Sequence, residues 1–189
     1  MSNIRNNWKL EEVLELFNKS FNELLFEAHD THIQNHKKDM VQVCTLLSIK
    51  TGGCPEDCGY CSQSMHSDDP IEATPLMSLE EVKKQATLAR DQGSTRFCMG
   101  AAWRRPSNKN IDRVIKMINV VHDLGMESCV TLGMLSEDQA VRLSKSGLNY
   151  YNHNLDTSRE YYTKVISTRN YQDRLNTLKY VRQSGIKVC

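Results

Sequence analysis

The chain has 189 residues, of which 39% are hydrophobic and 25% are charged, an ordinary balance for a folded globular protein. Its 24 lysine and arginine residues nearly balance 23 aspartate and glutamate residues, so the net charge of +1 predicts no nucleic-acid and no acidic-membrane partner. No apolar run approaches the roughly 20 residues that a membrane span needs, and the first residues lack the apolar core of a signal peptide, so we expect a cytoplasmic protein that handles small molecules.

The N-terminal part of the chain predicts one amphipathic helix. From Trp8 to Thr31, apolar residues recur at three- and four-residue steps, which is helical spacing. These residues are Leu10, Val13, Leu14, Phe17, Phe21, Leu24, Leu25 and Ala28. We therefore expect a helical segment over residues 1–38 and a separate domain over residues 39–189.

The rest of the chain predicts an alternation of strands and helices. Residues 41–49 are rich in apolar and β-branched side chains and are followed by Gly52 and Gly53, which indicates a buried strand. A capping box from Ser78 to Glu81 begins a helix that ends at Gly93. The same pattern predicts further strands at 95–99, 127–132, 148–154 and 186–189, and further helices at 111–124, 136–147 and 171–182.

This alternation favours an α/β fold built from right-handed βαβ units with a parallel sheet. We prefer a TIM-like (β/α) barrel to a doubly wound sheet, because no G-x-G-x-x-G segment follows the first strand and polar residues follow several different strands. Five strands do not close a barrel, and the last of them would expose an unpaired edge. We therefore expect residues 39–189 to form a partial barrel, about its first five strands, from a longer sequence.

Three cysteines follow the first predicted strand at the spacing C-x3-C-x2-C: Cys54, Cys58 and Cys61. The chain has seven cysteines and no export signal, which favours metal or redox chemistry over disulfides. Iron prefers thiolate, and three cysteines around a [4Fe-4S] cluster leave one iron open to a small molecule. Structural zinc is the competing interpretation, but it usually takes four ligands from paired units, and His66 is the only nearby histidine.

Three further cysteines occupy equivalent positions on different strands. Cys98, Cys129 and Cys189 each lie four or five residues after a glycine that ends a predicted helix. In a parallel barrel, inward side chains at equivalent depth meet in one layer, so the three thiols could converge. The alternative is that each is a buried structural cysteine.

The first cysteine motif, with Tyr60 directly before its third cysteine, resembles the signature of the radical S-adenosylmethionine (SAM) enzymes. Residues 46–58, 94–103 and 150–157 resemble segments of the biotin synthases within that group, and the match runs from about residue 8 to the end. The resemblance implies a radical-SAM-type barrel and a sulfurtransferase that converts dethiobiotin to biotin, the last step of biotin biosynthesis.

The resemblance also implies the cofactors and the order of the chemistry. Cys54, Cys58 and Cys61 would bind a [4Fe-4S] cluster whose open iron chelates SAM, and an electron from this cluster would cleave the sulfonium. The resulting 5′-deoxyadenosyl radical abstracts hydrogen from two carbons of dethiobiotin, and sulfur is inserted between them. In biotin synthases this sulfur comes from a [2Fe-2S] cluster. Its three cysteine ligands match Cys98, Cys129 and Cys189, with Arg96 nearby or, alternatively, in an ion pair on its strand.

Several other residues match positions that contact SAM in biotin synthases. They are Tyr60, Gly100, Ala101, Ala102, Asn154, Asp156 and Arg174. The resemblance implies that Tyr60 lies against the adenine, that Gly100 to Ala102 follow the methionine end, and that Asp156 accepts hydrogen bonds from the ribose. Arg174 would pair with the cofactor carboxylate, and its alternative is a solvated helix arginine.

The substrate site is matched by fewer residues. Lys50, Asn152 and Asn154 would lie near dethiobiotin, and Asn154 would contact the cofactor as well. We expect His153 to be a satisfied core histidine. Cys44 stands where some biotin synthases have serine, and we expect it to be a buried thiol without a further role.

The resemblance implies several partners: dethiobiotin, an electron donor of the flavodoxin or ferredoxin type, an iron-sulfur cluster assembly system and a second copy of the chain in a homodimer. Biotin synthases continue well past the position of Cys189, so we expect these 189 residues to be a fragment that makes no biotin alone. The alternatives are another radical enzyme of the same branch, such as a maturase, an iron-sulfur carrier or electron-transfer module, and an inactive truncated remnant.

Overall fold

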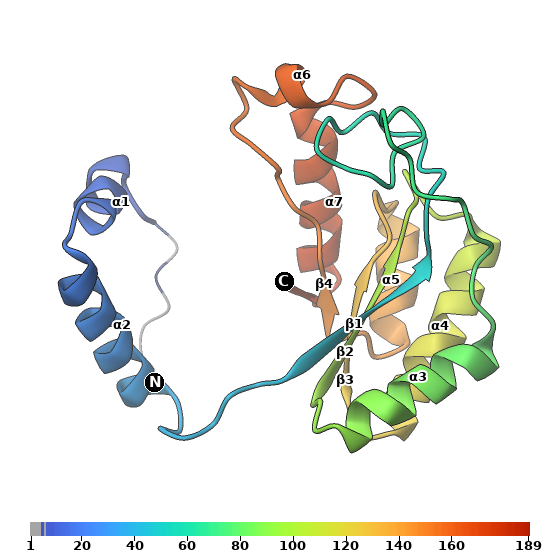
Figure 1. Ribbon diagram of the computed structural model, residues 1–189, viewed down its shortest axis with the longest axis horizontal. Coiled ribbons are helices and arrows are strands. Elements are labelled where there is room, and N and C mark those ends of the chain that lie inside the picture. Colours follow the sequence, from blue (N-terminus) through green and yellow to red (C-terminus); the bar gives the residue numbers. More distant parts are fainter. Residues whose placement is uncertain (1–4, 6) are drawn as a thin grey trace. The chain divides into compact units, whose positions relative to one another are not determined.

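The computed structural model describes residue 5 and residues 7–189. Contacts divide the chain into two compact units, Met1–Val41 and Gln42–Cys189 (Figure 1). The helical segment predicted over residues 1–38 includes residues 1–4 and 6, which lie outside the described residues. Across the described part of the chain, no helix has the length and apolar character that a membrane span requires.

The described residues of the N-terminal unit form two helices where the sequence predicted one. Helix α1 spans Leu10–Phe17 and helix α2 spans Phe21–Asn35. The helix breaks because Ser20 has extended backbone and accepts a hydrogen bond from the Glu23 amide at 3.4 Å, which begins a new helix. Apolar residues keep their helical spacing across such a break, so the spacing alone does not reveal it.

The second unit is a parallel five-stranded sheet in the order β1-β2-β3-β4-β5. Its strands are β1 (Cys44–Lys50), β2 (Arg96–Ala101), β3 (Glu127–Thr131), β4 (Tyr150–Tyr151) and β5 (Lys187–Val188). The connections contain α3 (Leu79–Asp91), α4 (Asn108–Asp123), α5 (Glu137–Lys145), α6 (Tyr162–Val165) and α7 (Tyr171–Gln183). A strand order that never reverses is the order of a (β/α) barrel and not of a doubly wound sheet, as predicted.

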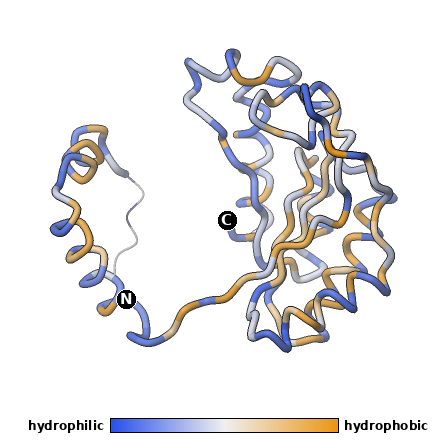
Figure 2. The backbone as a smooth tube through the Cα atoms, in the orientation of Figure 1, coloured by the Kyte–Doolittle hydropathy of each residue, from blue (hydrophilic) through white to orange (hydrophobic). Residues whose placement is uncertain are grey.

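One face of the sheet is covered by helices α3, α4, α5 and α7 (Figure 1). Side chains alternate along each strand, so Phe97 and Met99 of β2 and Val130 of β3 enter this core, with Val114 of α4 and Leu143 of α5. Figure 2 shows the hydrophobic residues gathered in the strands and on the helices beside them. The opposite face carries Arg96, Cys98 and Gly100, which are only partly buried.

Serine or asparagine side chains cap the N-termini of α3, α4, α5 and α7. Ser136 and Gln139 form a complete capping box at α5. The capping box predicted at α3 is only half formed. Ser78 Oγ accepts from the Glu81 amide at 3.1 Å, but the Glu81 side chain accepts from Gln85 at 2.8 Å instead of reaching back to the cap.

Strand β4 is much shorter than the predicted strand at 148–154. The Asn152 amide still donates to the Val130 carbonyl at 2.9 Å, and the chain then leaves the sheet. Asp156 has a φ of +68°, in the left-handed region that a strand cannot contain. The short strand therefore frees residues 153–156 to form a loop at the carboxyl end of the sheet.

Replacing Phe97 with alanine should lower the free energy of unfolding by about 3–5 kcal/mol, because it opens a cavity in the fully buried core between the sheet and its helices. Urea unfolding followed by circular dichroism measures this. The control Leu88→Ala removes an exposed leucine of α3 and should change the value by about 0.5 kcal/mol or less. Equal losses in the two variants would contradict the core assignment.

Candidate functional site

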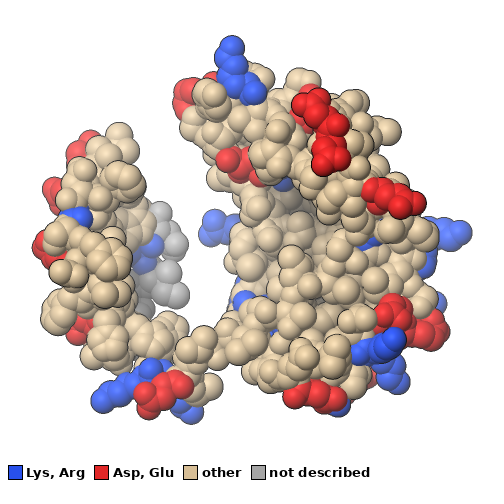
Figure 3. Space-filling model, in the orientation of Figure 1, with Lys and Arg blue, Asp and Glu red and all other residues tan. Residues whose placement is uncertain are grey.

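A cavity of about 360 Å³ opens at the carboxyl ends of β1, β2 and β3. The predicted site residues that line it are Lys50, Cys54, Cys58, Tyr60, Cys61, Gly100, Ala101, Ala102, Asn154, Asp156 and Arg174. Asn152 and the cysteines Cys98, Cys129 and Cys189 do not line it. On the face of the second unit shown in Figure 3, acidic and basic side chains are scattered around a hollowed, mostly uncharged middle.

The loop after β1 folds back on itself to present its three cysteines to this cavity. Gly52 and Gly53 both have positive φ, and a Cβ on Gly52 would lie 2.4 Å from the Ile71 carbonyl oxygen, so only glycine fits there. The Cys54 amide donates to the Gln63 carbonyl at 2.9 Å, and the Met65 amide donates to the Cys54 carbonyl at 2.9 Å. The turn is thus fixed before any ligand binds.

The three thiols suit a cluster better than a single ion. All three cysteines are free. Among the described residues, no three His, Cys, Asp or Glu side chains converge as the ligands of one metal ion would. In a [4Fe-4S] cluster each thiolate binds a different iron, so the sulfurs need not meet at one point. Burial raises the pKa of Cys54 and of Cys58, so cluster binding there would release protons.

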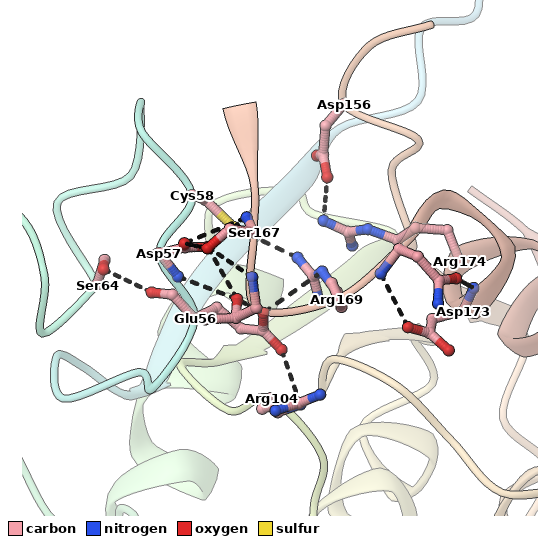
Figure 4. A network of polar contacts seen from close by, with 12 residues as sticks. Glu56, Asp57, Cys58, Ser64, Arg104, Asp156, Ser167, Arg169, Asp173 and Arg174 are labelled. Carbon is pink, nitrogen blue, oxygen red and sulfur yellow. Dashed lines mark hydrogen bonds and ion pairs between the residues drawn. The ribbon is translucent and has the colours of Figure 1, made fainter. Parts of the chain in front are cut away.

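A buried carboxylate sits inside the cysteine loop, a feature that the sequence interpretation missed. Glu56 is 2% exposed, and its Oε1 lies 3.2 Å from Arg104 Nε while its Oε2 lies 3.7 Å from Arg169 Nε (Figure 4). The Thr168 hydroxyl donates to Oε2. The carboxylate therefore connects the cysteine loop to the segment that precedes α7.

Asp57 makes a second connection to the same segment. Its carboxylate accepts hydrogen bonds from the Ser167 amide at 3.0 Å, from the Thr168 amide at 3.1 Å and from both hydroxyls (Figure 4). These hydrogen bonds hold the pKa of Asp57 well below its usual range, and the bond from the Ser167 hydroxyl contributes most. The Gly59 amide adds a bond to the Val165 carbonyl at 3.0 Å.

Asp156 and Arg174 form a buried ion pair in the cavity wall. Their side chains are 3% and 7% exposed, so Arg174 is not the solvated helix arginine of the alternative interpretation. Tyr60 donates a hydrogen bond to Asp156 Oδ1 at 2.6 Å, and Arg174 Nε donates to the Tyr162 hydroxyl at 3.2 Å. Asp156 and Arg174, which were predicted to contact two different ends of a cofactor, thus also contact each other.

Arg169 was also missed, and it contacts one of the three cysteines directly. Its Nη2 lies 3.4 Å from Cys58 Sγ, and its side chain is 5% exposed. The sequence does carry a partial signal, because two acidic residues lie between Cys54 and Cys58, and any of them that is buried needs a cationic partner. Which arginine supplies it cannot be read from spacing.

Two of the three cysteines in the second set are neighbours on the open face of the sheet, whereas Cys189 lies two residues beyond Lys187, the residue of β5 in register with Cys129 through Tyr150. Cys98 and Cys129 are register partners on β2 and β3. The interaction between these two thiols lowers the pKa of Cys98 to about 7 and, together with burial, raises that of Cys129. Cys129 alone is buried, so the structural-cysteine alternative fits only that residue. Gly100 and Thr131, two residues further along the strands, line the cavity on this same face.

Cys44 and Arg96 lie near this second set of cysteines. Cys44 differs from its expected burial, and Arg96 fits both of its interpretations. Cys44 is exposed and not buried, because it lies at the start of β1 on the face without helices. Arg96, its register partner, pairs with Glu127 at 2.7 Å and stacks 3.6 Å over the Tyr150 ring. Arg96 therefore makes the strand ion pair of the alternative, on the face that holds Cys98.

Three residues assigned to the substrate side or to the core have unusual polar contacts. His153 is buried, but its Nε2 has no hydrogen-bond partner among the described residues, so it is not the satisfied histidine that was expected. The buried Oδ1 of Asn152 also lacks a partner within the described chain. Lys50 Nζ donates to the Gly52 carbonyl. Within the described chain, His153 Nε2 and Asn152 Oδ1 are thus left without hydrogen-bond partners.

Comparison with known proteins agrees with this arrangement. The sequence model of the Radical SAM superfamily matches residues 48–189. The biotin synthase of Thioalkalivibrio sulfidiphilus (strain HL-EbGR7) is 57% identical over 189 residues, which are all of this chain and 56% of that protein. The biotin synthase of Erythrobacter litoralis (strain HTCC2594) is 56% identical over 189 residues, 55% of its length. The chain therefore spans about half the length of these curated relatives.

A solved structure shares the fold. HydG, a maturase of the [FeFe]-hydrogenase, superposes with a TM-score of 0.77 over 94% of this chain and 41% of its own, at 19% sequence identity. A likeness at that identity shows the parallel α/β architecture and no more. It agrees with the parallel order of the five-stranded sheet.

Replacing Asp156 with asparagine should lower the free energy of unfolding by about 3–5 kcal/mol, because Arg174 would stay buried without its counter-charge. Asparagine tolerates the left-handed backbone, so the loss reports the charge and not the backbone. Urea unfolding measures it. The control Asp112→Asn breaks a surface ion pair with Arg142 and should cost less than about 1 kcal/mol. A similar, small cost in both variants would refute the buried pair.

The stability of the metal-free chain should fall as the pH is lowered through the range 6.5 to 4. Burial lowers the pKa of His153 from 6.5 to about 3, so the unfolded chain takes up a proton in this range and the folded chain does not. Replacing His153 with glutamine should flatten the slope by up to about 1.4 kcal/mol per pH unit in urea titrations. An unchanged slope would show that His153 is protonated in the folded state. His66→Gln, at an exposed histidine, is the matched control.

Proposed function

This chain belongs to the Radical SAM superfamily, and on that premise we propose that residues 42–189 form the cluster- and cofactor-binding part of a biotin synthase. One observation carries the proposal. Three free thiols face a cavity whose wall holds the Tyr60–Asp156–Arg174 group, while a second set of thiols lies on the same sheet face. The identity of 57% to a biotin synthase supports the specific reaction, conversion of dethiobiotin to biotin.

The first cysteine set would hold a [4Fe-4S] cluster. When bound, that cluster supplies the electron that cleaves the sulfonium of SAM, and the cleavage starts hydrogen removal from the substrate. Cys54, Cys58 and Cys61 supply three thiolates and leave the fourth iron position to the cofactor. The loop geometry fixed by Gly52 and the backbone bonds of Cys54 holds these thiols at the cavity, where Cys58 is buried.

The cavity wall would bind and orient SAM. Asp156 Oδ1 accepts from Tyr60, and its carboxylate retains lone pairs that can accept the two ribose hydroxyls. Arg174, held by Asp156 and the Tyr162 hydroxyl, has further N–H groups for a carboxylate. The small side chains of Gly100, Ala101 and Ala102 leave room for a ligand along the end of β2.

Dethiobiotin would bind beside the cofactor, near Lys50, Asn152 and Asn154. The buried Oδ1 of Asn152 has no partner among the described residues and suits a substrate N–H. Lys50 Nζ can exchange its bond to the Gly52 carbonyl for a bond to a substrate oxygen. The ureido group of dethiobiotin offers both kinds of atom.

The second cysteine set would hold the [2Fe-2S] cluster that supplies sulfur. Cys98 and Cys129 are register partners, and Cys189 directly follows β5 of the same sheet, so these three residues would supply the thiolates of one small cluster. This set favours a biotin synthase over a maturase of the same branch. The ion pair of Asp156 and Arg174 inside the cavity disfavours a simple iron-sulfur carrier, which has no organic ligand to orient.

The proposed reaction sets the partners. A low-potential flavodoxin or ferredoxin-type protein would reduce the first cluster, a cluster assembly system would rebuild the second, and a homodimer is proposed from the family. These partners place the protein in the cytoplasm.

Anaerobic reconstitution with iron and sulfide tests the proposal. The chain should bind a [4Fe-4S] cluster with labile sulfide, and SAM should shift the electron paramagnetic resonance spectrum of its reduced form. Cys58→Ala should abolish this cluster, whereas Cys44→Ala, at an exposed thiol away from the loop, should retain it. Zinc without sulfide in the purified protein would refute the cluster, and a spectrum insensitive to SAM would favour a carrier.

A further inference from the structure

We propose that Arg169 sets the reduction potential of the cluster held by the three-cysteine loop, by giving the Cys58 sulfur a hydrogen bond and a positive charge. The inference rests on the proposed function, since it needs a cluster on Cys54, Cys58 and Cys61. It assigns Arg169 as a positioning and tuning residue that acts through Cys58, not as a ligand of the iron or of the substrate.

The contact is direct and its surroundings are dry. Arg169 Nη2 lies 3.4 Å from Cys58 Sγ, within the range of an N–H to sulfur hydrogen bond. The Arg169 side chain is 5% exposed, and Cys58 is buried as well. Figure 4 shows the guanidinium reaching from the segment before α7 toward the cysteine loop. A charge in such a place acts far more strongly than the same charge in water.

The backbone on both sides of Arg169 is fixed. The Thr168 amide donates to Asp57 Oδ1 at 3.1 Å, and Asn170 caps α7 by accepting from the Asp173 amide at 2.9 Å. The arginine therefore does not swing in from a mobile loop. Its direction toward the sulfur is part of the folded structure.

The ion pair with Glu56 does not by itself account for the direction of the Arg169 guanidinium. Arg169 Nε is 3.7 Å from Glu56 Oε2, and within the described residues this nitrogen makes no hydrogen bond. The Thr168 hydroxyl and Arg104 Nε lie closer to the carboxylate. An arginine present only to neutralise Glu56 would direct a hydrogen bond at its oxygens, whereas Arg169 directs one at the sulfur.

The effect on the cluster has a definite sign. Reduction adds negative charge to a cluster, and hydrogen bonds to its sulfurs and nearby cations stabilise the reduced form, which raises the potential. The guanidinium is permanently charged, so Arg169 should raise it. The buried carboxylate of Glu56 has the opposite sign and should lower it.

The test is a redox titration of the reconstituted 189-residue chain without SAM, followed by electron paramagnetic resonance. Arg169→Gln should shift the midpoint potential to a more negative value while iron and sulfide contents match the parent. Arg169→Lys should shift it less, because the charge remains but the fixed N–H geometry is lost. Glu56→Gln should shift it to a more positive value. Arg105→Gln, an exposed arginine of the β2–α4 connection, is the control for loss of one charge and should leave the potential unchanged.

The outcomes separate this inference from the proposed function. A parent chain that binds no cluster refutes the proposed function. A cluster with an unchanged potential in Arg169→Gln refutes the tuning role, and so does an Arg169→Gln variant that only weakens SAM binding. If Arg169→Gln fails to retain the cluster, Arg169→Lys decides, since a potential equal to or above that of the parent overturns the inference.

Discussion

The buried carboxylate of Glu56 imposes a constraint on which the rest of the site depends, because a charge that is 2% exposed must be neutralised where it lies. Arg104 from the connection after β2 and Arg169 from the segment before α7 approach it from two sides. These contacts join the cysteine loop to two other parts of the domain. When these contacts are made, Arg169 lies against Cys58. The cavity wall then carries a positive charge beside that sulfur without any ligand.

The sheet supplies the other half of the geometry. Its helices cover one face, so every second residue of β1, β2 and β3 is left for chemistry on the other. Gly100 and Thr131 line the cavity, and Cys98 and Cys129 stand two residues behind them on the same face. The early end of β4 then releases the loop that carries Asp156 to meet Arg174. Two thiol sets and one ion pair thereby share a single surface.

Local sequence patterns predicted much of this architecture, but they did not predict the contacts between side chains that lie far apart in the sequence. Apolar spacing and helix-ending glycines placed the strands well enough to predict that Cys98 and Cys129 lie at equivalent positions on β2 and β3. The same patterns ran past the break at Ser20 and overextended β4, because a hydrogen-bonded cap and one left-handed residue are single-residue events. The Glu56–Arg169 and Asp156–Arg174 contacts depend on tertiary placement, which spacing alone does not encode.

The long reach of the loop contacts has a consequence for the order of folding. Asp57 and Ser167 are 110 positions apart in the chain, whereas each βα unit is built from neighbours. Local units form early, and contacts between distant segments must wait for chain closure, which carries an entropic cost. During synthesis Cys54, Cys58 and Cys61 emerge long before the segment at residues 167–169, which supplies the positive charge of Arg169 beside Cys58. The Cys58 sulfur therefore stays without its arginine partner until residues 167–169 have emerged and packed against the cysteine loop.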